Sequence, residues 1–334
     1  PEFREQMLRN LTKVEGMPLP ALQRGVHWNF ESFGEYLDAI ASRGTVANVA
    51  GFVGHACIRA YVMGEAASQR AATDEELTQM QAVLEQALED GAIGIGTSTA
   101  ESHNCEGGVP VPSRFAAEKE FLAFSDVMRK SSKGIWQITK GAGPSMAFLE
   151  QLATSANRPM QICPMLQDPG KPEWVFEEFA QIHDARSRGC ELFGQVSPFP
   201  EVMEFNLHEP FMFESIRAWK RAMEANGTHA KMSIYQDPGF REKVKNELTQ
   251  PGGPFRFSNQ WVSMTILQSS DDELIGTTVA QIASQRGIHP LDCMLDIGIA
   301  DQLQTQFRCE MFNADEAAVA RLLDDEFSTL GLGD

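Results

Sequence analysis

The chain has 334 residues, and its 43% of hydrophobic residues provide enough apolar material for a sizeable core. Its formal net charge of -18 repels phosphate backbones and anionic lipids, so we expect no nucleic acid and no membrane as partner. No apolar run reaches the roughly 18 to 20 residues that a membrane-spanning helix needs. Six scattered cysteines without a CxxC pair indicate reduced thiols, which predicts a cytoplasmic protein.

The first predicted strand covers residues 47–53, an apolar run that ends just before Gly54 and His55. Farther on, Thr73 and Glu76 form a capping box, which predicts the start of a helix that Gly91 ends. The apolar positions of this helix recur at helical spacing and predict one buried face. They are Leu77, Met80, Leu84, Ala87 and Leu88.

Apolar runs and helical patterns continue to alternate over the next hundred residues. The predicted strands are residues 92–98, 134–139, 159–163 and 190–196, and the predicted helices are residues 116–129, 145–154 and 173–188. Short strands that are apolar on both faces and alternate with long helices are typical of a parallel sheet in an α/β fold. The alternation alone does not separate a closed barrel from an open sheet.

The pattern loosens from about residue 197 to residue 268, where we expect an irregular excursion that carries a few helices, such as residues 215–225. Helices are expected again at residues 277–286, near Pro290 and from residue 313. A last apolar run, residues 328–334, ends in the carboxylate of Asp334. We interpret residues 1–334 as a single domain.

Candidate functional residues follow from one rule. In a parallel α/β barrel the working side chains lie at the C-terminal ends of the strands and in the loops after them. Arg114 joins them because a guanidinium can clamp a carboxylate, although it can equally pin its own loop. A structural role stays open for each candidate, for example a core role for Cys163 and a solvated loop charge for Lys140. The rule selects His55, Arg59, Thr97, Ser98, Thr99, Lys140, Cys163, Ser197 and Asp334.

Known local motifs are missing from the sequence. The remaining histidines are isolated, and there is no HxH, HExxH or Cys/His cluster of the kind that binds zinc. The sequence also lacks a GxSxG nucleophile elbow, a Walker loop and a GxGxxG turn after a strand. The residues by themselves therefore indicate an α/β enzyme scaffold without a specified reaction.

Five stretches in the same order resemble one family, the N-acyl-D-amino-acid deacylases (D-aminoacylases) of the amidohydrolase superfamily. The resemblance implies a metal-dependent TIM-type (β/α) barrel, of which this chain would hold about six of the eight strands. The first strands and a small β domain would be missing. The stretches are residues 48–64, 70–98, 111–114, 279–292 and 330–334.

The resemblance also implies a mechanism and a set of roles. A zinc-activated water would attack an amide carbonyl, and Asp334 would hold the place of the aspartate that takes the proton and can also bind the metal. Two histidine ligands are expected at the ends of middle strands, where Ile138 and Pro164 stand instead. The HxH motif and a cysteine ligand would lie before Pro1. The candidate substrate contacts are His55, Ser98, Arg114 and Lys140.

The leading hypothesis is a hydrolase that cleaves the non-peptide C–N bond of a small substrate such as an N-acyl amino acid. The alternative is a non-catalytic barrel that binds a small ligand or a partner, which the missing histidines favour. A third hypothesis, oxidoreductase or lyase chemistry on the same barrel, has no cofactor motif to support it. The 334 residues alone are expected to be inactive and poorly soluble, because an incomplete barrel exposes strand edges.

Overall fold

The computed structural model describes residues 4–14, 17, 19–105, 108–213, 215–250 and 257–331. The chain forms two compact units that exchange short segments. Unit 1 comprises Pro1–Pro164, Glu177–Gln195 and Glu326–Thr329, and unit 2 comprises Met165–Phe176, Val196–Asp325 and Leu330–Asp334. The single domain expected over residues 1–334 stays a prediction. In the described residues no helix has the length and apolar character to cross a bilayer.

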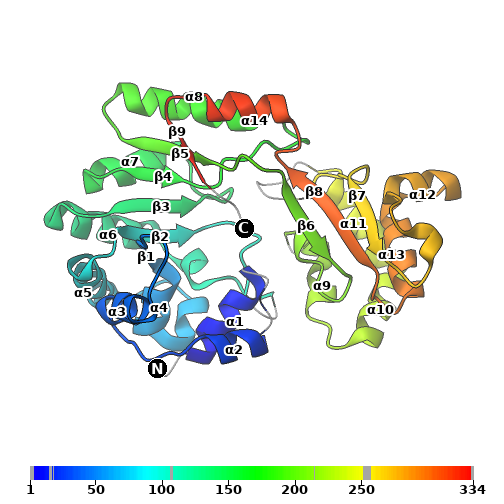
Figure 1. Cartoon of the computed structure of the whole chain (residues 1–334), viewed down its shortest axis with the longest axis horizontal. Coiled ribbons are helices and arrows are strands. Elements are labelled where there is room, and N and C mark those ends of the chain that lie inside the picture. The colour runs from blue at the N-terminus through cyan, green and yellow to red at the C-terminus, as the bar shows by residue number, and fades with distance from the viewer. Residues whose placement is uncertain are drawn as a thin grey trace. The chain divides into compact units, whose positions relative to one another are not determined.

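Unit 1 is built around a parallel sheet with helices between successive strands (Figure 1). Three helices that the sequence patterns did not predict come first, α1 (Arg4–Val14), α2 (Leu19–Gly25) and α3 (Phe33–Arg43). The strands are β1 (Phe52–Gly54), β2 (Gly94–Ser98), β3 (Ile135–Thr139), β4 (Met160–Ile162), β5 (Leu192–Val196) and β9 (Ser328–Leu330). The helices between them are α4 (His55–Met63), α5 (Asp74–Asp90), α6 (Glu118–Ser131), α7 (Met146–Ala156) and α8 (Trp174–Ser187).

The strand order is β1-β2-β3-β4-β5-β9, so each strand lies beside the next one in the sheet. The pairs from β1 to β5 are parallel, which confirms the predicted α/β class. A sequential order without reversal is the order found in a (β/α) barrel. In the described part of the chain the sheet ends at β1 and β9, so closure into a TIM-type barrel stays a proposal.

The sequence signals for α5 are confirmed in detail. Thr73 accepts a hydrogen bond from the Glu76 amide while the Glu76 side chain accepts one from the Thr73 amide. At the other end Gly91 adopts a left-handed conformation with φ of 114° and caps the helix. The five apolar positions predicted to face inward are the buried residues of this helix. The packed face of α5 therefore follows directly from its sequence period.

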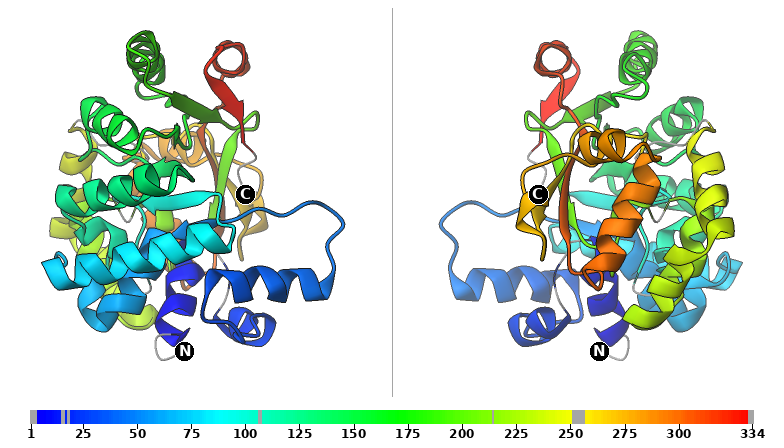
Figure 2. Two further views of the ribbon diagram at one scale, coloured as in Figure 1. Left: turned by 90° about the vertical axis from the view of Figure 1, so that its left-hand side faces the viewer. Right: turned by 90° about the vertical axis from the view of Figure 1, so that its right-hand side faces the viewer.

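The first strand is shorter than predicted. Only Phe52–Gly54 pairs with β2, whereas the apolar run from residue 47 to residue 50 is exposed. In Figure 2 this run is part of a long arc between α3 and β1. Val46 and Val49 are among the exposed large hydrophobic residues. Apolar character alone did not reveal that this backbone finds no neighbouring strand among the described residues.

The sheet of unit 1 has one face packed on helices and one polar face. The Trp136 indole donates a hydrogen bond to Ser125 Oγ on α6, so Trp136 faces the helices. Side chains alternate along a strand, which places the neighbouring Gln137 and Thr139 on the opposite face. The side chains of Gln137 and Thr139 lie near the Cys163 thiol and partly offset the rise in its pKa that burial causes, which places the thiol on the same face. We call this the polar face of unit 1.

Unit 2 contains regular structure where an irregular excursion was expected. An antiparallel sheet has the order β6-β8-β7, formed by β6 (Glu201–Phe205), β8 (Gln306–Phe312) and β7 (Met264–Gln268). Both β6 and β7 lie within the predicted excursion of residues 197–268, so that prediction was wrong in this respect. The helices are α9 (Lys220–Met223), α10 (Thr228–Gln236), α11 (Pro238–Leu248), α12 (Val279–Arg286), α13 (Pro290–Ala300) and α14 (Glu316–Leu323).

Aromatic side chains fill the core of unit 2. Phe213 stacks on Trp219 with ring centroids 4.5 Å apart, and Phe257 meets Trp261 edge-on at 4.6 Å. All four residues are buried. Burial of such large rings supplies much of the apolar area that stabilises a small unit. The Phe residues between residues 197 and 268, where an irregular excursion was expected, therefore contribute to a packed core.

Candidate functional site

The carboxyl ends of β2 and β3 lie side by side in unit 1. Ser98 pairs in register with Thr139, and the Thr99 amide donates to the Thr139 carbonyl at 2.9 Å. One strand farther, the Cys163 amide donates to the Ile138 carbonyl at 2.9 Å. The sheet therefore brings the loops after three neighbouring strands to one edge. This is the edge at which parallel α/β proteins place their ligands and catalytic groups.

Ser98 lies at this edge and contacts a histidine that the sequence rule did not select. Its Oγ is 2.7 Å from Nδ1 of His103, and the Ala100 amide donates to the same Oγ at 3.2 Å. Burial and the nearby Arg114 charge lower the pKa of His103 to about 4, so the ring is neutral near pH 7. Because His103 lies within the loop, five residues beyond Ser98, only this close spacing signals the pair in the sequence.

Arg114 fixes the same loop from the short helix Pro112–Phe115. Its Nη1 donates to Asn104 Oδ1 at 2.7 Å and to the His103 carbonyl at 3.3 Å. The loop-pinning role that the sequence left open is therefore present. Burial lowers the pKa of Arg114, although the group keeps its charge at neutral pH. Arg114 combines a structural role with a position next to Ser98 and His103.

Lys140 follows β3 and forms an ion pair with Glu178 of α8. The Lys140 Nζ and Glu178 Oε1 atoms are 2.6 Å apart, and the two side chains are only 12% and 8% exposed. Lys140 is therefore not a solvated loop charge. Two opposite charges that leave water together are held in place by their mutual attraction. The pair fixes the loop after β3 to the helix that follows β4.

His55 lies behind the sheet rather than at its open edge. The side chain is fully buried; Nδ1 is 2.8 Å from Thr97 Oγ1, and Nε2 is 2.6 Å from Glu120 Oε1 of α6. Both ring nitrogens are thus occupied by protein groups. The structure does not bring His55 together with Ser98, because consecutive residues such as Thr97 and Ser98 point to opposite faces of a strand.

Glu120 also binds Arg59, which completes a buried network of His55, Arg59, Thr97 and Glu120. Arg59 Nη1 and Glu120 Oε2 are 2.5 Å apart, and Arg59 also donates to the Ala67 and Arg70 carbonyls. Burial lowers the pKa of His55, whereas hydrogen bonds from His55 and Arg59 outweigh burial and lower the pKa of Glu120. A neutral imidazole therefore donates to an ionised carboxylate, and the network joins α4, α6 and β2.

The donors expected for a metal do not fit. Ile138 lies two residues from Trp136, so its side chain shares the face packed on helices and is only 1% exposed. An apolar side chain cannot bind zinc, and the same holds for Pro164. Asp334 lies outside the described residues. Within the residues that are described, no three His, Cys, Asp or Glu side chains come together as metal ligands.

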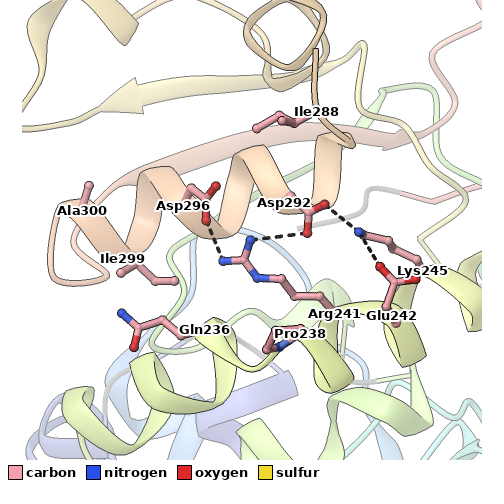
Figure 3. A pocket seen from close by; sticks show the side chains of 10 residues that line it. All are labelled: Gln236, Pro238, Arg241, Glu242, Lys245, Ile288, Asp292, Asp296, Ile299 and Ala300. Atoms are coloured by element: carbon pink, nitrogen blue, oxygen red, sulfur yellow. Dashed lines mark hydrogen bonds and ion pairs between the residues drawn. The ribbon is translucent and has the colours of Figure 1, made fainter. Parts of the chain in front are cut away.

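A surface pocket of about 640 Å³ lies in unit 2, apart from any residue selected from the sequence. Figure 3 shows Arg241 and Lys245 of α11 facing Asp292 and Asp296 of α13. Arg241 Nη2 is 2.6 Å from Asp296, and Lys245 Nζ is 2.6 Å from Asp292. These charges are paired within the protein, so the pocket is a salt-bridged groove between two helices.

Comparison with known proteins extends these findings. No family model matches the chain. An uncharacterized protein of Mycobacterium tuberculosis is 25% identical over 307 residues, which is 86% of this chain and 50% of the relative. The D-aminoacylase of Alcaligenes xylosoxydans xylosoxydans is 46% identical over 80 residues, which is 24% of this chain and 16% of that enzyme. The chain spans about half the length of the uncharacterized relative and a smaller part of the D-aminoacylase.

Solved structures agree in fold. A D-aminoacylase studied for its binuclear metal centre matches with a TM-score of 0.51 and 19% identity, over 90% of this chain and 51% of that one. An N-acyl-D-glutamate deacylase of Bordetella bronchiseptica, in complex with zinc and a phosphonate inhibitor, matches with a TM-score of 0.52 and 18% identity over the same shares. The chain therefore shares the fold of about half a D-aminoacylase, and its resemblance to the N-acyl-D-amino-acid deacylases is confirmed.

Proposed function

We propose that the protein hydrolyses the amide bond of small N-acyl amino acids at the carboxyl edge of the unit 1 sheet. The observation that carries this proposal is the gathering of Ser98, His103, Arg114 and Lys140 at that edge of a fold shared with the D-aminoacylases. Loops at this edge hold the reactive groups of parallel α/β enzymes. The D-aminoacylase and the N-acyl-D-glutamate deacylase named above carry names that refer to acylated D-amino acids, which suggests the substrate class.

Arg114 is the group best suited to hold the substrate carboxylate. A guanidinium has five N–H donors in a planar fork. Among the described residues, the protein oxygens that Arg114 binds are bound through its Nη1 alone. The donors of Nε and Nη2 are left for a ligand. We propose that Arg114 binds the α-carboxylate there, while the ion pair of Lys140 with Glu178 fixes the neighbouring loop after β3. A guanidinium at this position selects a substrate that carries a carboxylate.

The proton transfers are assigned to Asp334 by resemblance. In the proposed reaction a water oxygen forms a bond to the acyl carbon, the C–N bond breaks, and Asp334 moves the water proton to the leaving amine. The two solved enzymes named above contain a metal centre or zinc, but Ile138 and Pro164 cannot hold a metal. We therefore derive no step through zinc. Elemental analysis of the full-length protein measures whether it binds zinc, and release by Asp334→Asn would identify Asp334 as a ligand.

The test is hydrolysis of N-acetyl-D-methionine, N-acetyl-D-aspartate and N-acetyl-D-glutamate, with their L enantiomers, by the full-length protein. We expect turnover of at least one D substrate and a loss of about 100-fold or more in kcat with Asp334→Asn. Arg114→Met should raise KM about tenfold or more, because it removes a charge-assisted pair with the carboxylate. Arg129→Met on the exposed side of α6 is the matched control and should leave KM unchanged.

The outcomes separate the proposed enzyme from its alternative. Turnover that survives Asp334→Asn would remove Asp334 from the mechanism and leave the substrate assignment in place. Binding of N-acyl amino acids without turnover would instead identify a non-catalytic protein that keeps the fold. The absence of both binding and turnover for every substrate would contradict the proposed function.

A further inference from the structure

One ring nitrogen of His103 is held by the protein, and the described residues provide no hydrogen-bond partner for the other. Nδ1 lies 2.7 Å from Ser98 Oγ, whereas among the described residues no hydrogen bond to Nε2 is found. The side chain is half-buried, so Nε2 bonds to solvent or to a ligand. Neither the sequence motifs nor the family resemblance assigned this residue a role.

The hydrogen bonds of Ser98 favour one of the two neutral tautomers of His103. The Ala100 amide donates to Ser98 Oγ at 3.2 Å, which uses one of the two lone pairs of this oxygen. The hydroxyl proton of Ser98 also needs an acceptor, and His103 Nδ1, at 2.7 Å, is the one that the described residues offer. We assign that proton to the bond with Nδ1, so that the proton of the neutral ring lies on Nε2 and can be donated.

The loop keeps this donor in a fixed orientation. The His103 amide donates to the Ala100 carbonyl at 3.1 Å, and the Val111 amide donates to the His103 carbonyl at 3.2 Å. Arg114 Nη1 donates to the same carbonyl at 3.3 Å. Four hydrogen bonds thus hold residue 103, counting that to Ser98. A donor held in advance costs less entropy on binding than one that must be ordered.

We propose that His103 is a substrate-binding residue, whose neutral Nε2–H donates to an oxygen of the carboxylate that Arg114 binds. This inference rests on the proposed function and deepens it, because it makes carboxylate recognition a joint property of the His103 loop and Arg114. The ring stays neutral above about pH 5, since its pKa is about 4. Binding through this donor is then independent of pH between 5 and 8, unlike binding to an imidazolium.

The test measures the ring nitrogens and ligand affinity of the full-length protein. In nitrogen-15 NMR of the histidine side chains, His103 should show an unprotonated Nδ1 and a protonated Nε2 between pH 5 and 8. Addition of N-acetyl-D-methionine or of acetate should shift the Nε2 signal. N-acetyl-D-methionine amide, which lacks the carboxylate, should not.

Substitutions provide the second readout. His103→Leu should raise the Kd of N-acetyl-D-methionine about tenfold, whereas His103→Gln, whose amide can donate from nearly the same place, should stay within about threefold. The matched control is His229→Leu on α10, an exposed residue of unit 2 that should leave Kd unchanged. Ser98→Ala should alter the Nδ1 signal of His103 by removing its donor.

Failure of this inference differs from failure of the proposed function. If the protein hydrolyses N-acyl amino acids while His103→Leu leaves Kd unchanged and the Nε2 signal does not move, His103 has no role in binding. If acetate shifts the signal in a protein that hydrolyses no N-acyl amino acid, the carboxylate site stands and the proposed reaction is wrong. Stronger binding as pH falls through 6.5 would show an imidazolium and overturn the neutral donor.

Discussion

Glu120 is the residue on which the buried network of unit 1 depends. It accepts hydrogen bonds from His55 and Arg59 while it is only 1% exposed. Nε of Arg59 is already buried without a hydrogen-bond partner in the described part of the chain. The carboxylate is the charge that balances Arg59 there. Removing one member of such a pair leaves the other charge buried and uncompensated.

Glu120→Gln should therefore lower the free energy of unfolding of unit 1 by about 3 to 5 kcal/mol. The control is Glu118→Gln, an exposed residue two positions earlier in α6, for which we expect less than about 0.5 kcal/mol. Urea titration followed by tryptophan fluorescence reports the difference, since Trp136 packs on the same helix. Equal effects of the two substitutions would show that the network does not stabilise the fold.

Two histidines of unit 1 make stability depend on pH. Burial lowers the pKa of His55 and of His103 below the ordinary value of 6.5. Below pH 6.5 the unfolded chain thus binds protons that the folded chain does not, so stability falls as pH falls. For His103 the loss ends near its folded pKa of about 4.

We expect the melting temperature to decrease steadily from pH 7 to pH 4, and to decrease less in His103→Gln, which removes one of the two titrating groups. Differential scanning fluorimetry across this range measures both slopes. His229→Gln, an exposed substitution, should keep the slope of the parent protein. A melting temperature that rises on acidification would mean that these rings are charged in the folded state.

At the scale of the element, the pair α11 and α13 is held by a charged groove rather than by apolar contact alone. Arg241 donates to the Tyr235 carbonyl at 2.7 Å, and its two terminal nitrogens bind Asp292 and Asp296. Its side chain is 15% exposed, so these bonds lie partly out of water. One arginine therefore links three helices, α10, α11 and α13.

Arg241→Ala should destabilise unit 2 by about 1 to 3 kcal/mol, because it leaves acceptors of the groove unsatisfied and removes the packing of the stem. Arg221→Ala is the matched control. This substitution breaks the 2.8 Å ion pair between Arg221 and Asp237, whose side chains are 64% and 37% exposed. It should lower the free energy of unfolding by less than about 1 kcal/mol. Measuring the stability effects of both substitutions at 0.05 M and 1 M salt tests whether partial burial is the cause. Salt screens the partly buried ion pairs of Arg241 less than the exposed pair of Arg221, so the effect of Arg241→Ala should change less.

Local signals predicted the elements that carry their own period and caps. The helix α5 was predictable from Thr73, Glu76, Gly91 and its buried face, and the parallel strands from their apolar runs. Pairing over long distances was not. Strand β8 joins β6 and β7, which lie before it in the chain, and no local pattern shows that partnership. About half of the site could be predicted. Ser98 and Lys140 follow the strand-end rule and Arg114 was chosen for its guanidinium, whereas the roles of His103 and Glu120 depend on contacts that form only in the folded chain.

For the whole molecule, the sheet of unit 1 has two edges in the described residues, β1 and β9. Val46 and Val49 precede β1 in an exposed segment without regular secondary structure. An unpaired strand edge next to exposed apolar residues favours association between chains. We expect the 334-residue chain to self-associate and Val49→Lys to raise its monomeric fraction several-fold in analytical ultracentrifugation. Thr78→Lys on exposed α5 is the control, and a monomeric parent chain would refute the prediction.

The two units also allow a test of the single domain predicted from the sequence. Glu120 belongs to unit 1 and Arg241 to unit 2. If residues 1–334 unfold as one domain, Glu120→Gln and Arg241→Ala shift the same single transition in scanning calorimetry. Two transitions, each moved by one substitution only, would instead show that the units unfold independently.

The adjacent residues Thr97 and Ser98 belong to two separate hydrogen-bond networks, the buried one around Glu120 and the one that holds His103. Thr97 is committed to the buried network and Ser98 to His103, on opposite faces of the same strand. An insertion or deletion of one residue in β2 would exchange the two side chains and disrupt both networks at once. The length of β2 before Ser98 is therefore more constrained than those parts of the following loop that do not hold His103 in place. Protein engineering that aims to change ligand preference should therefore keep the length of β2 unchanged.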